Sequence, residues 1–521
     1  MSDEPIHLPK LVGGDIEFGH TLEGSAGNGC MAAGRLLLRE IDGLPLHANH
    51  DLRDYDPAPA WGGAGFRVVR GERFGCGIGR RYRPANGGCF YLDHAHYEAC
   101  LPELCSAREH VASWHGIIRT TREALARANA RLPKGKRIRV LFIGSDGYGN
   151  AFGAHNNFLI TRRAWNSIFQ QPPILRWLAT FQVSSIIYTG QGKVGAENGA
   201  PPCDFQLAQR ADFFECLKSL ETTYRRGIVN SRDEPLGLRG ARLHCIFFDV
   251  NLCHVAHYLR VGAMQIVLTM IEAGAVDHSL SLANPVTALR AFSHDPTLGA
   301  TAELALGKKV TAIELQMLFC EAAAKFVADG RCQGLVQEAG RIVSLWTDTL
   351  AKLGRRDFAA LAGRIDWILK RSLLEGALNG DPTLSWESPK MRLLDQGYGD
   401  LEDGMFWQCH KAGLIEHLVN DTEIERSIRE PPADTRAFFR SRLLSLAPPE
   451  TVDHVSWQQI VFRLPLGDGS WDLFHTVHLD DPLAFPGPDH PMHNARTLAE
   501  ALAVIDQPIP VPVTPSIIHA N

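Results

Sequence analysis

The chain has 521 residues, of which 45% are hydrophobic and 21% are charged. This balance is typical of a folded protein with a large core and excludes an intrinsically disordered chain. The net charge of −5 gives no overall excess of basic residues, so the totals predict neither a nucleic-acid partner nor an anionic membrane surface as partner. The start of the chain lacks the pattern of a signal peptide, and no apolar run approaches the roughly 18 residues of a membrane span. We therefore expect a cytoplasmic protein.

Short apolar runs with strand character alternate with glycine-rich connections in the first half of the chain, and helical periodicity dominates later. The expected strands are Leu11–Phe18, Cys89–Asp93, Arg137–Ile143, Phe158–Thr161, Ser185–Tyr188, Gly227–Asn230 and Arg242–Asp249. The expected helices are Ala107–Ala130, Val255–Ala273, Ala312–Ala328, Leu335–Leu353 and Asp357–Glu375. The spacing between strands is too irregular for a repeated βαβ unit. We predict an α+β fold in which helices cover one face of a mostly antiparallel sheet.

Two segments suggest the domain organisation. Residues 48–88 are rich in Gly, Pro and Arg and have no clear period, so we interpret them as a long loop near a site or a lid, with disorder as the alternative. Proline pairs at 431–432 and 448–449 mark a boundary. A strand over Val455–Leu464, a helix over Arg496–Ile505 and a proline-rich tail follow it. We expect a large domain over residues 1–440 and a small one over 441–521.

The first expected strand carries two carboxylates, Asp15 and Glu17, flanked by glycines. Because successive side chains of a strand alternate between its two faces, both carboxylates point to the same face. Mg²⁺ prefers such oxygen ligands and usually combines one or two carboxylates with phosphate and water. An ordinary solvated strand face is the alternative.

A second group of ionisable residues begins at Tyr91 and ends at Glu98. Tyr91 and Asp93 share one face of their strand, and the apolar Phe90 and Leu92 occupy the other. So many ionisable groups in eight residues favour pKa shifts and metal binding. The histidines of this segment are equally consistent with a solvated surface.

Polar side chains also interrupt the strand Arg242–Asp249, where Arg242 and His244 project to one side. An arginine beside a histidine is suited to gripping a nucleotide phosphate, and a turn after Val229 presents Arg232 in the same way. A histidine satisfied within the core and a surface ion pair of Arg232 are the alternatives. The glycine strings 75–79 and 190–192 lack the context of a phosphate-binding loop.

Taken together, these segments resemble the Pup ligases and the Pup deamidase/depupylases, relatives of glutamine synthetase that act on a small protein modifier. The matching segments are Gly-Gly-Asp-Ile-Glu-Phe-Gly at 13–19, Phe-Tyr-Leu-Asp-His-Ala-His at 90–96, Gly-Ala-His-Asn-Asn-Phe-Leu at 153–159, Phe-Gln-Leu-Ala-Gln-Arg-Ala-Asp-Phe at 205–213, Leu-Glu-Thr-Thr at 220–223, Asn-Ser-Arg-Asp-Glu-Pro at 230–235, Arg-Leu-His at 242–244, Ser-His-Asp-Pro-Thr-Leu at 293–298 and Pro-Pro-Ala-Asp-Thr-Arg-Ala-Phe-Phe-Arg at 431–440. They follow the order of the family from residue 11 to about residue 465.

The resemblance implies a glutamine synthetase-like domain whose curved antiparallel sheet holds ATP, or ADP with phosphate, together with Mg²⁺. It implies a partner that is a Pup-like modifier and its conjugates. By position, Asp93 would be the catalytic aspartate. The resemblance assigns binding of the metal, and of the phosphates that the metal bridges, to Asp15, Tyr91, Glu98, His155 and His244, with Glu17 beside them. It assigns phosphate binding to Arg232 and Arg242, and contact with the nucleotide to Trp457.

Within the family, the sequence resembles the depupylase branch more than the ligase branch. The spacing Asp-His-Ala-His at 93–96, the insertion before Cys89 and the segment 220–230 all favour the hydrolytic form. A ligase that attaches the modifier to lysine, and a nucleotide-binding regulator without catalysis, are the alternatives. Asp15, Cys89 and Asn156 stand where the family has Glu, Arg and Glu.

Overall fold

The computed structural model describes residues 7–25, 29–45, 78–93, 95–234, 237, 240–465 and 472–505. Most of the loop expected over 48–88 and the proline-rich tail lie outside the described residues. The end of that loop is corrected, because Ile78–Tyr82 forms strand β3 and pairs with the next strand along the chain. Within the described part, none of the helices combines the length and the hydropathy that a membrane span requires.

An eight-stranded sheet organises the first half of the chain, and all its pairings are antiparallel. Its order is β12-β7-β1-β5-β4-β3-β2, and β6 pairs with the far half of the long strand β1. The bounds are β1 Val12–Glu23, β2 Leu44–Pro45, β3 Ile78–Tyr82, β4 Cys89–Asp93, β5 His96–Cys100, β6 Arg137–Leu141, β7 Ala154–Ile160 and β12 Ala241–Cys245.

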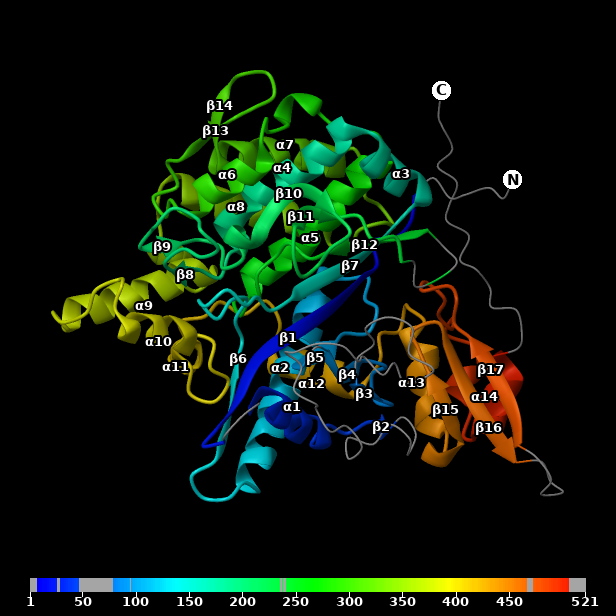
Figure 1. Cartoon of the computed structure of the whole chain (residues 1–521). Coiled ribbons are helices and arrows are strands. Elements are labelled where there is room, and N and C mark those ends of the chain that lie inside the picture. Colours follow the sequence, from blue (N-terminus) through cyan, green and yellow to red (C-terminus); the bar gives the residue numbers. More distant parts are fainter. Residues whose placement is uncertain are drawn as a thin grey trace, which may run out of the picture.

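One face of this sheet is apolar and is covered by helices (Figure 1). Ile16 and Phe18 of β1 pack with Phe90 of β4 and with side chains of α1 (Gly29–Arg39) and α2 (Ala107–Ala130). On the other side of β1, Phe158 and Leu243 pack with α4 (Pro172–Thr189) and α5 (His254–Glu272). The predicted α+β architecture with a mostly antiparallel sheet is confirmed.

Helices with strong local signals have the bounds that the sequence predicts. Ser106 caps α2 by accepting hydrogen bonds from the backbone N–H groups of Arg108 and Glu109, and α7 (Ala312–Ala328) begins at a capping box of Thr311 and Glu314. These caps satisfy backbone donors that a helix leaves free at its start, so the first residue of the helix is defined locally.

Three expected elements differ most from the structure, because tertiary packing decided them. Ser185–Tyr188 is not a strand but belongs to the end of α4, which is buried from Trp177 to Thr189. A short buried apolar run has no period that distinguishes a helix from a strand. The strand expected over Arg242–Asp249 stops at Cys245, and Asp249 instead accepts backbone N–H bonds from Gln191 and Gln209.

The helix expected from Asp357 is α9 and begins at Asp366, whose carboxylate accepts the backbone N–H groups of Leu252 and Cys253. The remaining elements are α3 Arg162–Gln170, β8 Lys193–Val194, β9 Phe205–Gln206, β10 Phe214–Ser219, β11 Arg226–Asn230, α6 Pro285–Ser293, β13 Thr301–Glu303, β14 Lys309–Thr311, α8 Ala339–Gly354, α9 Asp366–Gly380, α10 Pro389–Gly397, α11 Met405–Lys411, α12 Asp421–Arg429, α13 Ala437–Leu446, β15 Val452–Val455, β16 Gln459–Pro465, β17 Asp472–His478 and α14 Leu498–Ile505.

The C-terminal part contains a three-stranded antiparallel sheet, β15-β16-β17, in place of the single strand expected over Val455–Leu464. Its apolar side chains pack with α13 and α14 and with Tyr82, Cys89 and Tyr91 of the large sheet. The two sheets therefore share one apolar contact (Figure 1).

A buried ion cluster fastens this contact. Both oxygens of the Glu103 carboxylate accept hydrogen bonds from Arg440, and one of them also accepts from Arg436 Nε at 2.7 Å. Arg440 also donates to the backbone oxygens of Gly87 and Trp457. Burial alone would raise the pKa of Glu103, but the two guanidinium groups lower it to about 2.

Glu103→Gln should destabilise the protein by about 3–5 kcal/mol, because it leaves two buried guanidinium groups without their counter-charge. The lowered pKa of Glu103 means that this stabilisation is complete above about pH 4.5 and is lost as the pH falls towards 2. Urea unfolding of wild type and variant at pH 7 and pH 3 measures both effects. Glu402→Gln is the control, since its partner Arg137 is half exposed and such pairs contribute about 1 kcal/mol or less. Equal losses in the two variants would contradict the assignment.

Candidate active site

The face of the large sheet opposite the helices is polar. Side chains of five adjacent strands, β12, β7, β1, β5 and β4, alternate so that their apolar members enter the core and their polar members gather on this face. We call it the polar face; its members are Asp15, Glu17, Tyr91, Asp93, His96, Glu98, Cys100, His155, Asn157, Arg242 and His244.

Asp15 lies at the centre of the polar face and is held by β7. His155 is its cross-strand neighbour, and His155 Nδ1 lies 2.8 Å from Asp15 Oδ1. Asn157 Nδ2 donates to Asp15 Oδ2 at 3.3 Å. Burial alone would raise the pKa of Asp15, but the charge and hydrogen bond of His155 outweigh it and hold this pKa well below its usual range. Asp15 is therefore an ionised carboxylate in the site.

His244 joins the same group from β12. Its Nδ1 donates to Asn157 Oδ1 at 2.7 Å, and Arg242 donates to the same oxygen at 2.9 Å. Burial, together with the charges of His155 and Arg242, lowers the pKa of His244 well below its ordinary value. The ring is neutral, and the bond at Nδ1 leaves the Nε2 lone pair available, which is the form that a metal ligand requires.

Glu98 provides the second carboxylate of the central cluster. It is 4% exposed and accepts a hydrogen bond of 2.5 Å from the Tyr91 hydroxyl. Asp15, Glu98 and Cys100 each offer one ligand atom within 4.8 Å of the others. Burial, reinforced by the charges of Asp15 and Glu17, raises the pKa of Glu98 well above its ordinary value.

Glu17, the cross-strand neighbour of Glu98, has partners of its own. Its Oε2 accepts the backbone N–H of Gly153 at 2.8 Å and lies 3.3 Å from His96 Nδ1. Burial opposes ionisation, but these bonds and the charge of His155 lower the pKa of Glu17 to about 2. Only glycine fits at position 153, because a Cβ would lie 2.5 Å from His155 Nε2 and 3.0 Å from Glu17 Oε1.

These groups fit a divalent cation. Carboxylate oxygens are the protein ligands that Mg²⁺ prefers, together with phosphate and water. A neutral imidazole can accept a hydrogen bond from such a water. Three carboxylates lie together on one face, and the pKa of Glu98 is raised because its carboxylate neighbours add negative charge to its burial. A bound cation would offset that negative charge and allow Glu98 to ionise.

Asp93 ends β4 on the polar face, opposite His96 in the register with β5. It is half-buried, and its charge contributes to raising the pKa of His96 and of Glu98. The turn that follows contains Ala95 with φ of 74°, a left-handed conformation that this short side chain tolerates at a small cost. Asp93 thus stands at the rim of the carboxylate cluster.

The predicted phosphate ligands are only partly brought together. Arg242 contacts the site directly through Asn157 and also binds the Glu234 side chain at 3.0 Å. Arg232 follows β11, lies 3.7 Å from Glu234 and is 39% exposed. Its charge reaches the site, because it contributes to lowering the pKa of His244.

Trp457 lies in the connection between β15 and β16. Its ring contacts Tyr82 at a centroid distance of 5.6 Å, and the Arg440 guanidinium lies over it at 4.6 Å. It belongs to the apolar contact between the two sheets and makes no described contact with the carboxylate cluster.

Two departures from the family pattern have a structural account. Asn156 faces the core rather than the site, and its amide lies 3.2 Å from His110 Nε2 beneath the sheet. Cys89 is fully buried on the Tyr91 side, and burial raises the pKa of its thiol to about 12. On the neighbouring strand β3, the guanidinium of Arg80 lies over the Tyr91 ring at 4.2 Å.

Sequence reasoning missed Cys100, Asn157 and Arg80. The first two lie two residues beyond Glu98 and His155 on the same strands, so the strand period was sufficient to predict their direction. Arg80 lies in a segment interpreted as loop, where no period pointed to a strand.

Comparison with known proteins identifies relatives that match most of the chain. Residues 10–461 match the family described as Pup-ligase protein. A depupylase of Acidothermus cellulolyticus is 37% identical over 384 residues, which are 73% of this chain and 75% of the relative. A Pup–protein ligase of Acidimicrobium ferrooxidans is 34% identical over 408 residues, 77% of this chain and 86% of the relative.

Two solved structures share the fold. The complex between the prokaryotic ubiquitin-like protein Pup and its ligase PafA superimposes with a TM-score of 0.75 at 23% identity and covers 95% of this chain and 92% of the ligase chain. PafA in complex with ADP gives a TM-score of 0.68 at 24% identity over 82% of this chain and 89% of that chain. The expected glutamine synthetase-like fold is confirmed by this likeness.

Binding of Mg²⁺ should release protons, because burial and the charges of Asp15 and Glu17 raise the pKa of Glu98 in the free protein and a bound cation would lower it. The affinity for Mg²⁺ should therefore rise with pH. It should level off at pH values at which Glu98 is already ionised in the metal-free protein. Isothermal titration calorimetry in buffers of different ionisation enthalpy counts the protons. In Glu98→Gln the release should disappear; an unchanged proton count in that variant would reject Glu98 as the source.

Proposed function

Because the chain belongs to the Pup-ligase protein family, we propose that it is an ATP- and Mg²⁺-dependent amidase and isopeptidase. Its substrate would be the C-terminal Gln or Glu of a Pup-like modifier, free or joined to a lysine. The observation that carries this proposal is the convergence of Asp15, Glu98, His155 and His244 on one polar face, with Asp93 at its rim.

The polar face supplies the binding groups that the reaction needs. Asp15, Tyr91, Glu98, His155 and His244 would hold the cation and the phosphates it bridges, and Glu17 would orient His96 and Gly153 beside them. Arg242 and Arg232 would neutralise phosphate. When bound, Mg²⁺ and phosphate would supply a positive field around the glutamyl carbonyl.

Asp93 would perform the chemistry. A carboxylate at the end of a rigid strand can attack a side-chain carbonyl or take a proton from water. Its neighbour His96 is fixed by Glu17. Burial lowers the pKa of His96, but the hydrogen bond and charge of Glu17 and the charge of Asp93 together outweigh it and raise this pKa, which favours the protonated ring. That positive charge would keep Asp93 ionised and would donate a hydrogen bond to a leaving amine.

The hydrolytic direction is supported by sequence features around the site. The spacing Asp-His-Ala-His at 93–96 and the long insertion before Cys89 are typical of the depupylase branch, and the Acidothermus cellulolyticus relative is a depupylase. A ligase is the second candidate, favoured by the structural likeness to PafA over 95% of this chain. In that case Asp93 would take a proton from an incoming lysine amine.

Mass spectrometry of a Pup-like peptide ending in Gln separates the two directions. With ATP and Mg²⁺, we expect conversion of the terminal amide to an acid and release of the peptide from a lysine conjugate, without ADP formed in proportion to product. ADP and conjugate formed together only when a Glu-ending peptide and a lysine protein are supplied would establish the ligase instead. If neither product forms, both candidates are overturned.

Asp93→Asn should abolish that turnover, by at least about a thousandfold, and leave nucleotide binding unchanged, because Asp93 lies at the rim of the carboxylate cluster and is not among the proposed phosphate ligands. Asp403→Asn, which changes an exposed carboxylate on a loop, should retain full activity. Turnover in the Asp93 variant near the wild-type rate would reject the catalytic role.

We also propose that Arg80 supplies the positively charged side chain that Cys89 cannot provide. The family has an arginine at position 89, and Arg80 on the adjacent strand presents its guanidinium over Tyr91, a residue of the proposed metal site. The guanidinium group is thus contributed by β3 instead of β4.

Arg80→Gln should weaken nucleotide binding about tenfold, as expected for loss of one charged hydrogen bond to phosphate. Arg81→Gln is the matched control: Arg81 pairs with Phe90 in the register, on the other face of the strand. Fluorescence titration with a labelled ATP analogue measures both affinities. Equal effects of the two substitutions would contradict a specific role of Arg80.

A further inference from the structure

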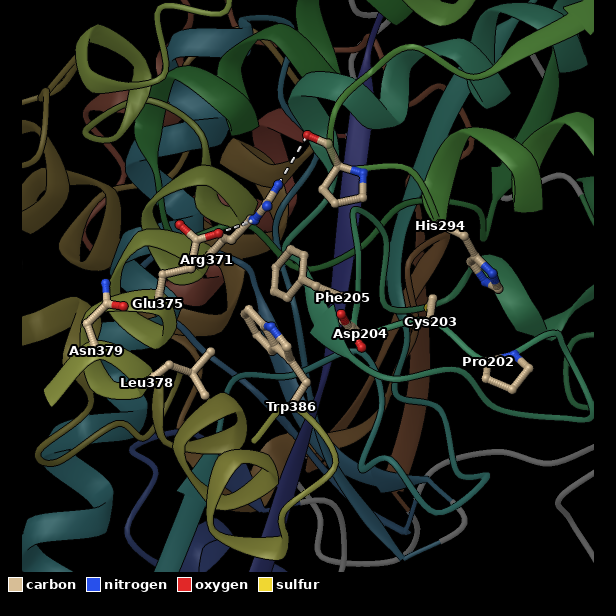
Figure 2. Close-up of a pocket in the computed structure, with 11 residues that line it drawn as sticks. Pro202, Cys203, Asp204, Phe205, His294, Arg371, Glu375, Leu378, Asn379 and Trp386 are labelled. Carbon is tan, nitrogen blue, oxygen red and sulfur yellow. Dashed lines mark hydrogen bonds and ion pairs between the residues drawn. The ribbon is translucent and has the colours of Figure 1, made fainter. Parts of the chain in front are cut away.

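A cavity of about 630 Å³ lies outside the polar face, between α9 and the segments before β9 and after α6 (Figure 2). Phe205 and Trp386 form an aromatic wall with ring centroids 6.0 Å apart. Arg371 and Glu375 of α9 form a 2.7 Å ion pair at another side. The volume and the mixture of aromatic and charged groups are typical of a site for a small polar molecule.

One end of this cavity is lined by Cys203 and His294, which lie beside one another in Figure 2. His294 Nε2 lies 2.8 Å from Asp212 Oδ1, and the Asp212 side chain is fully buried. Asp212 is fixed in turn, because its Oδ2 accepts the backbone N–H of Glu197 and the side-chain N–H of Gln206. Thiol, imidazole and carboxylate thus follow one another from the cavity towards the interior.

The imidazole of this group carries a proton at neutral pH. The hydrogen bond to Asp212 is the main cause and the interaction with Cys203 adds to it, so that the pKa of His294 is raised to about 9. His294 also stands at the C-terminal end of α6, where the helix dipole favours positive charge. A protonated ring beside a thiol stabilises the thiolate, the reactive form of cysteine.

Cys203 differs in this respect from the other accessible cysteines. Among the described residues, Cys30, Cys203 and Cys216 are partly exposed and the remaining free cysteines are buried. Burial raises the pKa of Cys30 and of Cys216, and the charge of Glu215 raises that of Cys216 further. Neither thiol lines the cavity.

We propose that Cys203 is a nucleophilic thiol that exchanges with low-molecular-weight disulfides entering this cavity. After Cys203 loses its proton to solvent, the thiolate attacks one sulfur of the disulfide. A new sulfur–sulfur bond forms at Cys203 as the original one breaks, and the second sulfur leaves as a thiolate that takes the proton of His294. The Cys203 sulfur is oxidised and the leaving sulfur is reduced, so that no other oxidant is needed.

The cavity defines the class of partner. The aromatic wall provides apolar contact, and Arg371, Glu375 and the exposed Asp204 provide charged groups of both signs. A small peptide disulfide, which carries ammonium, carboxylate and amide groups around its sulfur bond, matches this combination.

The site of exchange is tested with glutathione disulfide and the native full-length chain, followed by peptide mass spectrometry. Cys203 should acquire one glutathione at least about ten times faster than Cys30 or Cys216. Cys203→Ser should remove this fast modification. Faster modification of any other cysteine, or equal rates of modification at all of these cysteines, would overturn the proposal.

The role of His294 is tested by the leaving group. In His294→Gln, both exchanges should slow because the Cys203 thiolate loses its neighbouring charge. Exchange with glutathione disulfide should slow about tenfold more than exchange with the aromatic dithiobis(nitrobenzoate), whose leaving thiolate is stable without a proton. Equal slowing with both reagents would overturn the proton transfer.

A measurement on the wild-type protein keeps the test available if that variant does not fold. The ratio of the glutathione disulfide rate to the aromatic disulfide rate should be higher at Cys203 than at Cys216 in the same sample. An equal ratio at the two thiols would overturn the role of His294.

Discussion

The alternation of side chains between the two faces of five adjacent strands, with apolar groups dominating the core face and polar groups the other, is the constraint on which the rest of the structure depends. On one face, Ile16, Phe18 and Phe90 fill the core beneath α1 and α2; on the other, the same strands present carboxylates and imidazoles. A shift of one residue in any pairing would carry charged groups into the core and apolar groups into the site. The packing of the apolar face therefore holds the polar face in register, and the site needs no loop to define it.

The three central carboxylates are unequal because their partners are unequal. Asp15 and Glu17 each have an imidazole and a further N–H donor within hydrogen-bond distance. Glu98 has the Tyr91 hydroxyl, lies more deeply buried and is the cross-strand neighbour of Glu17. The protein therefore holds two carboxylates with lowered pKa values beside one whose pKa is raised, an arrangement that a divalent cation would stabilise.

The contact between the two sheets links the polar face to the C-terminal segment. Glu103 follows β5, and its two arginine partners belong to α13 and the turn before it. Arg440 also lies over Trp457, while Tyr82 and Tyr91 pack in the same apolar cluster. Through this cluster, the position of β3 and β4, and with it that of Tyr91 and Arg80, depends on the C-terminal sheet. The cavity with Cys203 and His294 lies apart from this contact, against α9.

The sequence by itself determined the features that depend on short spacing. The pairs Asp15 and Glu17, Tyr91 and Asp93, and Arg242 and His244 share a strand face because the strand period is two, and α2 begins where Ser106 caps it. Only the tertiary structure decided that Ser185–Tyr188 is helical, that Arg80 approaches Tyr91, and that Cys203, Asp212 and His294 meet at one cavity. The physical reason is that local periods state which way a side chain points, whereas the partner it meets is set by how distant segments pack.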